Sequence, residues 1–380
     1  MIKIVTIIGA RPQIIKAAAL SREIKVNFSS KIKEIIVHTG QHYDHNMSAV
    51  FFDELDIPYP DYNLGIGSGT HGEATGKMIE GIEKILLDLK PDFVVLYGDT
   101  NSTLAGAIAA SKIHIPIVHI EAGLRSFNKR MPEEINRILC DHSSTLLFAP
   151  TENGFNNLLR EGFKNTNSPY TIDNPGIFNS GDIMLDNSIY FGEKADNIST
   201  VLTELNLSLE GYFLATVHRA DNTDGVHNLV QIFNGLHDIS LKSNLDVIIP
   251  LHPRTKEKIS SLSGSLKKTW FNDSKLRIIE PVSFLDMICL EKNSKMIITD
   301  SGGVQKEAFF FHRPCIILRN ETEWVEIVEN GCAILSGANS QKMMLAYDSL
   351  KMANNSYPNL FGNGNAAHFI CEKIVNLDEH

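Results

Sequence analysis

Short apolar runs alternate with helical segments along nearly the whole chain, and this alternation limits the possible fold more than any other feature of the sequence. In the first half, the apolar runs occupy residues 3–8, 34–38, 93–97, 115–120, 145–149 and 177–179. The alternation restarts with runs at 213–217, 247–250, 276–279, 296–299 and 315–318. Continuous apolar runs separated by helices are typical of doubly wound parallel sheets. The sequence therefore predicts an α/β protein with two Rossmann-like domains and a cleft between them.

The size and charge of the chain fit this fold. Its 380 residues suffice for two domains with separate cores, and we place them at residues 1–180 and 181–360. The composition, with 43% hydrophobic and 21% charged residues, is that of a soluble globular protein. A formal net charge of −10 argues against nucleic acid or an anionic membrane as the main partner, because proteins bind both through clustered Lys and Arg.

Cysteine usage and the N-terminus indicate a cytoplasmic protein. The five cysteines are scattered and lack CxxC spacing, so we interpret them as reduced core thiols and predict no metal site. Residues 1–10 are apolar but too few to span a membrane, and they run directly into a turn. We therefore predict a first strand here and no signal peptide.

Residues 296–311 are the clearest candidate for a phosphate site. An apolar run ends at Asp300, a Ser-Gly-Gly turn follows at 301–303, and a helix is predicted from residue 304. Glycines let the main chain approach a ligand closely, and the unsatisfied N–H groups of a first helical turn attract phosphate. Glu307 lies one turn into the helix, where it can accept hydrogen bonds from a sugar diol. The alternative is an ordinary strand–helix connection in which Asp300 caps the helix.

Cations stand at two further strand ends. The turn after the first strand holds one glycine and not the three of a dinucleotide-binding turn, so NAD binding is not expected. This turn does place Arg11 beside a helix start, with Lys16 one turn into that helix, while His218 and Arg219 follow a strand of the second half. Strand ends face the ligand crevice of an open α/β sheet. This position favours a binding role for these cations over the alternative, in which they are simply solvated side chains.

Three carboxylates occupy successive ends of predicted elements in the first half. Asp99 follows the apolar run 93–97, and Glu121 directly ends the run 115–120, where desolvation raises a carboxyl pKa and suits it to proton transfer. Glu133 stands at the start of a helix. Each also has a structural alternative, since Asp99 can cap a helix and Glu133, behind Pro132, can open one and pair with Arg137 four residues later. Together they favour acid–base chemistry.

Three loops complete the prediction. The segment after the second strand contains Gln41 and His42, but its two histidines fit no zinc spacing, so hydrogen-bonding roles are favoured. Residues 65–72 are rich in glycine and predict a mobile loop over the crevice, with a plain connector as the alternative. Residues 350–366 predict a loop before a final helix at 367–375.

Taken together, the sequence resembles the non-hydrolysing UDP-N-acetylglucosamine 2-epimerase family over essentially its whole length. The matching motifs, in order, are GARPQIIK (9–16), YGDTNST (97–103), HIEAGLRS (119–126), PEEINR (132–137), VHRADNTDG (217–225), LHPRT (251–255), DSGGVQKEA (300–308) and FGNG (361–364). The resemblance implies two domains of the glycosyltransferase-B type, with the last helix, at 361–380, returning to the first domain. It also implies a homodimer.

The resemblance further implies roles for individual residues. Those expected to hold UDP are Arg11, His218, Ser301, Gly302 and Glu307, with Glu307 on the ribose. Those expected to serve the chemistry are Asp99, Glu121, Glu133 and His218, to which we add Lys16. The remaining predicted contacts are Arg219, His252, Arg254 and Gly303 with UDP, and Gln41, His42, Arg125, Arg130, Asn136 and Arg137 with the sugar.

Two departures from the common family pattern point to one branch. The chain has Ala10 and Gln13 where GTRPE is common, and it carries SFNKRMPEE at 126–134. Both features resemble the branch that acts on UDP-2,3-diacetamido-2,3-dideoxy-glucuronate, a precursor of surface polysaccharides such as O-antigen. A uronate needs a cation, which Arg130 or Lys129 can supply, with a solvent-exposed Lys-Arg pair as the alternative. The absence of an acid at position 13 would ease the approach of a second anion.

The chemistry explains the residue types. The C2 hydrogen of a nucleotide sugar is barely acidic, so its direct removal without a redox cofactor is a poor route. Expelling UDP from C1 loosens that hydrogen, a carboxylate removes it to leave a glycal, and protonation from the other face with return of UDP gives the epimer. We expect no cofactor. Which carboxylate removes the proton and which returns it stays open.

Other functions remain as alternatives. The substrate can be UDP-N-acetylglucosamine, which would give UDP-N-acetylmannosamine. A UDP-sugar glycosyltransferase would need an acceptor site, and a catalytically silent UDP-sugar sensor would not need three acids. Residues 43–44, Tyr-Asp, depart from the pattern of members that bind an activating second UDP-sugar, so no such regulation is expected.

Overall fold

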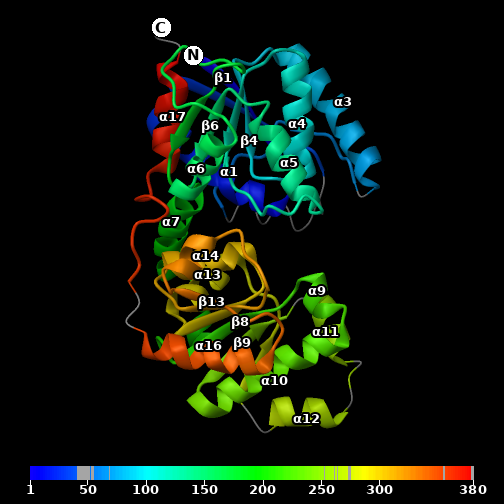
Figure 1. The fold of residues 1–380 in the computed structure, drawn as a ribbon, viewed down its shortest axis with the longest axis vertical. Helices are drawn as coiled ribbons and strands as arrows, with labels where there is room; N and C mark the ends of the chain where they lie inside the picture. Colours follow the sequence, from blue (N-terminus) through cyan, green and yellow to red (C-terminus); the bar gives the residue numbers. More distant parts are fainter. Residues whose placement is uncertain are drawn as a thin grey trace. The chain divides into compact units, whose positions relative to one another are not determined.

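The computed structural model describes residues 1–40, 52, 55–67, 69–251, 253–260, 262, 264–272, 275–353 and 356–377. The chain divides into two compact units, with Met1–Ile189 and Asn359–His380 in unit 1 and Tyr190–Pro358 in unit 2. Each unit contains one parallel sheet with helices packed on it (Figure 1). This confirms the predicted α/β fold with two Rossmann-like sheets. The division between the units falls within helix α7, Ile183–Ile198, further along the chain than the predicted crossing at 180.

Unit 1 contains a seven-stranded parallel sheet in the order β3-β2-β1-β4-β5-β6-β7. Its strands are β1 Ile2–Ile8, β2 Ile32–His38, β3 Tyr62–Asn63, β4 Phe93–Tyr97, β5 Ile117–Ile120, β6 Leu146–Ala149 and β7 Gly176–Asn179. Burial on both faces explains why most of these strands are almost continuously apolar. Because all the strands are parallel, the turns that follow β1, β4 and β5 lie along one edge of the sheet.

The helices of unit 1 cover both faces of this sheet (Figure 1). They are α1 Arg11–Glu23, the π-helix η1 Ile24–Phe28, α3 His71–Leu89, α4 Asn101–Lys112, α5 Pro132–Asp141, α6 Glu152–Arg160, most of α7, and α17 Ala366–Asn376. Helix α4 packs between α3 and α5 on one face of the sheet. It lies so close to strand β4 that a Cβ at Gly106 would be 2.5 Å from Leu96 Cδ2. Helix α17 packs against α1, where the His368 Nδ1 and Glu23 Oε1 atoms are 2.7 Å apart.

Unit 2 repeats the pattern with a six-stranded parallel sheet in the order β10-β9-β8-β11-β12-β13. Its strands are β8 Tyr212–Thr216, β9 Asp246–Pro250, β10 Leu276–Ile279, β11 Met296–Thr299, β12 Cys315–Ile317 and β13 Ala333–Leu335. Its helices are α8 Val201–Glu204, α9 Ala220–Thr223, α10 Val226–Ser243, α11 Pro253–Ser260, α12 Gly264–Asn272, α13 Phe284–Asn293, α14 Gly302–Phe310, α15 Val325–Glu329 and α16 Ser340–Met352. The central strands β8 and β11 pair in register and lead to the turns of the predicted nucleotide site.

Two predicted loops are shorter than expected. Helix α3 begins at His71, inside the predicted loop 65–72, because the Thr70 hydroxyl accepts a hydrogen bond from Glu73 N (3.4 Å) and so caps the helix. Helix α16 continues to Met352, which leaves only the later part of the predicted loop 350–366 irregular.

The five cysteines are all buried and none forms a disulfide, as the sequence predicts for core thiols. In the described part of the chain, no helix has both the length and the hydrophobicity needed to cross a membrane.

Candidate active site

The turns after β1, β4 and β5 bring charged side chains together in unit 1. Strand β4 lies between β1 and β5 in the sheet, so Asp99, after β4, is flanked by Lys16 of α1 and by Glu121 after β5. Lys16 Nζ and Glu121 Oε2 form an ion pair, and the two side chains are only 12% and 11% exposed. Gly98 makes room for the ammonium group, because a Cβ there would lie 3.1 Å from Lys16 Nζ. The structure thus places three of the predicted catalytic residues in one cluster.

Asp99 is held by two residues of helix α5. Arg137 Nη2 donates to Asp99 Oδ2 at 2.5 Å, and Asn136 Nδ2 donates to the Asp99 carbonyl oxygen at 2.9 Å. Burial raises the pKa of Asp99 above its usual value, and the Glu121 carboxylate adds to this rise, while Arg137 and Lys16 oppose it. A carboxyl with a raised pKa exchanges protons more readily near neutral pH, as an acid–base group must.

The backbone of Glu121 has an unusual conformation. Its φ is +75°, in the left-handed region that a residue with a Cβ enters only at a cost of about 1–2 kcal/mol. Two hydrogen bonds hold it there, because the N–H groups of Glu121 and Ala122 both donate to the Phe148 carbonyl oxygen, at 3.1 and 3.0 Å. The strain is localised at a predicted catalytic residue, where such strain is most often found.

Helix α5 rules out one structural alternative for Glu133. Its first turn contains Glu133 and Glu134, and Arg137 pairs with Glu134 (2.7 Å) and not with Glu133. Glu134 is buried and also accepts hydrogen bonds from Ser126 N and Phe127 N, both at 2.9 Å. Burial alone would raise the pKa of Glu134, but these hydrogen bonds and Arg137 hold it below the usual value. Glu133 is exposed, and its catalytic role stays a prediction.

In unit 2, the buried carboxylate of Asp300 ties together the turns after β8 and β11. It accepts hydrogen bonds from the backbone N–H of His218 (3.1 Å), the backbone N–H of Arg219 (3.1 Å) and Asn222 Nδ2 (3.0 Å). The His218 ring, half exposed, has Nδ1 3.3 Å from Asp300 Oδ1. The sequence-based alternative, in which Asp300 caps the following helix, is therefore wrong.

Helix α14 begins at Gly302, earlier than predicted, with Ser301 as its N-cap residue. The Ser301 side chain makes no capping hydrogen bond, so its hydroxyl is not used to close the helix. A Cβ at Gly302 would lie 2.5 Å from Glu323 Oε1, so a larger residue there would displace that carboxylate. Glu307 is buried in the second turn of this helix. The N-terminus of α14 therefore has no capping side chain from Ser301, and phosphate binding at this turn stays a prediction.

Comparison with known proteins identifies the family. The family model described as UDP-N-acetylglucosamine 2-epimerase matches residues 24–375. The chain is 51% identical, over 99% of its length and 100% of the relative, to a UDP-N-acetylglucosamine 2-epimerase homolog of Methanococcus maripaludis. It is 47% identical, over 99% of its length and 100% of the relative, to UDP-2,3-diacetamido-2,3-dideoxy-D-glucuronate 2-epimerase of Pseudomonas aeruginosa. The chain belongs to the UDP-N-acetylglucosamine 2-epimerase family.

The fold of this epimerase agrees with solved members of the family. The crystal structure of Methanocaldococcus jannaschii UDP-GlcNAc 2-epimerase in complex with UDP-GlcNAc and UDP has a TM-score of 0.85 and 44% identity, with 99% of this chain and 100% of that chain covered. The Neisseria meningitidis enzyme bound to UDP-GlcNAc has a TM-score of 0.82 and 30% identity, with 99% and 100% covered. The predicted family is therefore confirmed.

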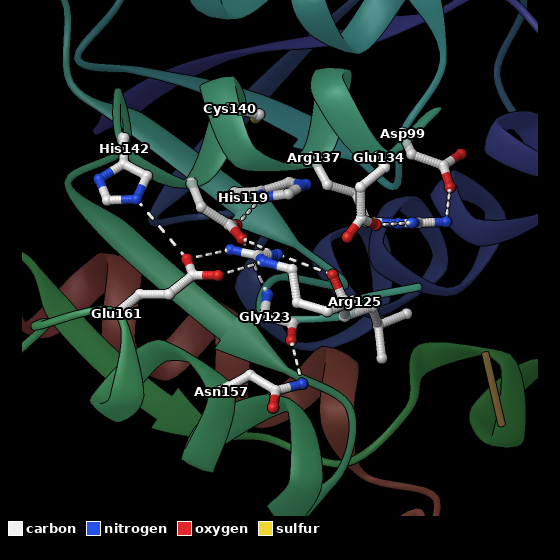
Figure 2. A network of polar contacts seen from close by, with 12 residues as sticks. Asp99, His119, Gly123, Arg125, Glu134, Arg137, Cys140, His142, Asn157 and Glu161 are labelled. Atoms are coloured by element: carbon white, nitrogen blue, oxygen red, sulfur yellow. Dashed lines mark hydrogen bonds and ion pairs between the residues drawn. The ribbon is translucent and has the colours of Figure 1, made fainter. Parts of the chain in front are cut away.

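Three of the predicted sugar contacts, Arg125, Asn136 and Arg137, have structural partners in the epimerase. Figure 2 shows the surroundings of Arg125 and Arg137. Arg125 is buried, and its guanidinium donates to Glu161 (2.6 and 2.7 Å), to Asp141 (2.7 Å) and to the Leu124 carbonyl oxygen (2.7 Å). Asn136 holds the Asp99 turn, as described above. The geometry of Arg125 favours a structural role over the predicted contact with the sugar. Arg130, by contrast, is exposed.

Gln13 has a structural role that the sequence did not predict. Its side chain is buried, with Oε1 accepting from the N–H groups of Gly9 (2.9 Å) and Ala10 (3.1 Å). Its Nε2 donates to the carbonyl oxygen of Tyr97 (3.0 Å) and to Thr103 Oγ1 (3.0 Å). A carboxylate could not donate to Tyr97, so the amide fastens the β1 turn to the end of β4. The expectation that the absence of an acid at position 13 eases the approach of a second anion stays a prediction.

The other predicted contacts fall into two groups. Arg11 is exposed at the first residue of α1, and Arg219 is partly buried after β8. Gln41, His42, residues 43–44 and His252 lie outside the described residues, as does the side chain of Arg254. Their roles stay predictions.

Glu291 of helix α13 gives a prediction about stability. It is 1% exposed, and among the described residues Oε2 has no hydrogen-bond partner. Burial raises the pKa of Glu291 well above its usual value, and the Glu307 carboxylate raises it further. Glu291→Met, which keeps the volume and removes the buried carboxyl, is expected to raise the free energy of unfolding by about 1–3 kcal/mol at neutral pH.

The pH dependence of this effect has a definite sign. A folded-state pKa above the unfolded value means that the wild type loses stability as pH rises above about 4.5, until the folded-state carboxyl also ionises. The stability gap between Glu291→Met and wild type should therefore widen from pH 4.5 upward in urea titrations. The exposed control Glu329→Met should change stability by less than about 0.5 kcal/mol. A gap that stays constant with pH would contradict the prediction.

Proposed function

We propose that this epimerase inverts C2 of a UDP-2-acetamido sugar by eliminating UDP, forming a glycal and adding UDP back after protonation from the opposite face. The observation that carries the proposal is the cluster of Lys16, Asp99 and Glu121 at the strand ends of unit 1. Two carboxylates in different environments, one paired with a lysine and one with Arg137, suit a reaction that removes one proton and returns another.

The residues of unit 2 supply the other requirement, a stabilised leaving group. UDP leaves as an anion, and the Ser301-Gly302-Gly303 turn at the N-terminus of α14 offers backbone N–H groups to its phosphates. His218 and Arg219 project from the neighbouring turn, which Asp300 fixes. In this proposal, Glu307 binds the ribose, and Arg11 of unit 1 adds positive charge.

Solvent exchange at C2 tests the reaction. In deuterated water, an epimerase of this mechanism places solvent deuterium at C2 of the product, which NMR detects. A glycosyltransferase would instead release UDP only when an acceptor is present, and a UDP-sugar sensor would do neither. Epimer formed without deuterium at C2 would exclude the elimination route.

For the substrate, we propose UDP-2,3-diacetamido-2,3-dideoxy-glucuronate, converted to the manno epimer for surface polysaccharide synthesis. Support comes from the 47% identical Pseudomonas aeruginosa relative and from the exposed Lys129 and Arg130 beside the start of α5. UDP-N-acetylglucosamine is the second candidate, because a Methanocaldococcus jannaschii UDP-N-acetylglucosamine 2-epimerase is 45% identical over 99% of this chain and 98% of the relative. Rates measured on both sugars decide between them.

Arg130 provides a prediction about substrate choice. If its guanidinium binds the uronate carboxylate, Arg130→Ala should lower kcat/KM for the diacetamido-glucuronate substrate about 10–100-fold, the value of one charge-assisted hydrogen bond. The rate on UDP-N-acetylglucosamine should change little. Arg160→Ala removes an exposed arginine of the same unit and serves as the matched control. Equal losses on both sugars would exclude the carboxylate contact.

We further propose that the enzyme acts as a homodimer in the cytoplasm. Sedimentation of the purified full chain measures the oligomeric state directly, and a mass of one chain would exclude the dimer.

A further inference from the structure

His119 occupies an unusual place in the core of unit 1. It lies within β5, and its partners across the neighbouring strands are Leu96 of β4 and Leu147 of β6. A fully buried histidine thus stands in an otherwise apolar row. Both ring nitrogens have a partner, with Nδ1 2.7 Å from Asp141 Oδ1 and Nε2 2.8 Å from the carbonyl oxygen of Gly98.

The partners of the ring determine its protonation. The Gly98 carbonyl only accepts hydrogen bonds, so Nε2 carries a hydrogen. Nδ1 faces the Asp141 carboxylate, which also accepts from Gly123 N (3.1 Å) and pairs with Arg125 (2.7 Å). Burial alone would lower the pKa of His119, but Cys140 and Asp141 raise it well above its usual value. Each ring nitrogen therefore faces an acceptor, an arrangement that favours the imidazolium form.

The charges of this network balance. Asp141, at the end of α5, lies between the cations His119 and Arg125, and these two cations hold its pKa below the usual value against the effect of burial. Arg125 also pairs with Glu161, next to α6, and Glu161 Oε2 lies 3.6 Å from the half-exposed His142 ring. Both ring nitrogens of His119 face hydrogen-bond acceptors. The buried ring therefore has the partners that a buried charge requires.

The network fastens the two turns that carry Asp99 and Glu121. Gly98, whose carbonyl oxygen binds His119, directly precedes Asp99, and Gly123, whose N–H binds Asp141, follows Glu121 by two residues. Each turn contains one residue in the left-handed backbone conformation, Gly98 with φ of +61° and Glu121 with φ of +75°. The His119 ring and the Asp141 carboxylate therefore fix the backbone of the turns that carry Asp99 and Glu121.

We propose that His119 is a positioning residue that sets the separation of Asp99 and Glu121, and thereby the balance between proton removal from C2 and proton return. The proposal rests on the proposed function, in which these carboxylates perform the two transfers. Without His119, the Gly98 carbonyl loses its partner and the Asp99 turn can shift. A shift of about 1 Å at a reacting group can cost about 100-fold in rate.

The test uses two variants of the full chain, compared with a matched control. His119→Gln can still donate to Gly98 but loses the charge. The double variant His119→Leu with Asp141→Asn removes one positive and one negative charge together, keeps an acceptor for Gly123 and Arg125, and gives the core a leucine like its neighbours, so it is expected to fold. Thr6→Val breaks another buried hydrogen bond of the same sheet, from Thr6 Oγ1 to Glu34 Oε1 (2.6 Å), and is the control.

For the double variant, we expect kcat to fall about 10–100-fold while KM and UDP affinity stay within about twofold, because none of the proposed UDP contacts belongs to the His119 network. The fraction of turnovers that end as free UDP and glycal should rise, since proton return is the step that fails. His119→Gln should lie between wild type and the double variant. A folded double variant with wild-type kcat and wild-type product partition would overturn the proposal, as would losses that merely follow the folded fraction seen by circular dichroism. Absence of C2 deuterium in the wild type would instead overturn the proposed function.

Discussion

Glu121→Gln is expected to lower kcat by about 10²–10⁴-fold, the usual contribution of a general acid–base group. The amide has nearly the shape of the carboxylate but cannot accept the C2 proton. It also leaves Lys16, whose ammonium group now pairs with Glu121, without its counter-charge. Steady-state rates and the rate of C2 deuterium exchange should fall together, while UDP affinity, measured by calorimetry, should stay unchanged.

The control for this experiment is Glu80→Gln. Glu80 pairs with Lys84 on helix α3, at 2.5 Å, in the same lysine–glutamate chemistry but on the exposed surface of unit 1. Such exposed pairs contribute about 0.3–0.5 kcal/mol, so neither stability nor rate should change measurably. If Glu121→Gln kept more than a tenth of the wild-type kcat, Glu121 would not be a proton-transfer residue.

The strands were predictable because burial on both faces of a parallel sheet leaves a direct trace in the sequence. The runs at 93–97, 276–279 and 296–299 coincide with β4, β10 and β11. Two edge strands left no such trace. Strand β3 has only two residues, Tyr62 and Asn63, both exposed, and β13 has three, of which two are half buried. Pairing with a neighbouring strand, and not the local sequence, defines these edges.

The positions of candidate site residues that directly follow strands were predictable from the sequence. Asp99 and Glu121 follow adjacent strands, so their proximity to Lys16 follows from the topology. The choice between Glu133 and Glu134 does not. The two are separated by about 100° around a helix, and only the packing of α5 decides which one turns inward to meet Arg137. Spacing alone allows Arg137 to pair with either neighbour, at i,i+3 or at i,i+4.

The His119 network shows the same limit. His119 and Asp141 are 22 positions apart, one in a strand and one at the end of a helix, and no local rule pairs them. The available signal was a histidine inside an apolar strand, since a fully buried imidazole requires partners for both nitrogens. Gln13 gives a comparable signal, because an amide buried beside a turn must use both its donor and its acceptor.

Arg137→Met should be the most destabilising of these substitutions. Arg137 is 6% exposed and joins two carboxylates, Asp99 at 2.5 Å and Glu134 at 2.7 Å. Its removal leaves two carboxyl groups, already poorly solvated, without their shared cation, and breaking one partner of a buried pair costs about 3–5 kcal/mol. Urea unfolding at pH 7 should show this loss, and catalysis should fail with it because Asp99 would bind its proton more tightly.

The pH dependence separates this cause from a simple packing defect. Without Arg137, the pKa of Asp99, which burial already raises, should rise further. The loss in free energy of unfolding should therefore be present above the unfolded-state pKa of about 4 and fade as pH falls toward that value. Adding Asp99→Asn should recover part of the loss at neutral pH, because the unpaired charge is gone. Arg160→Met, which removes only a 3.3 Å hydrogen bond to Asn157 in the same unit, should cost less than about 1 kcal/mol. A loss for Arg137→Met that is equal at pH 4 and pH 7, and is not relieved by Asp99→Asn, would mean that Arg137 stabilises the fold by packing and not by charge.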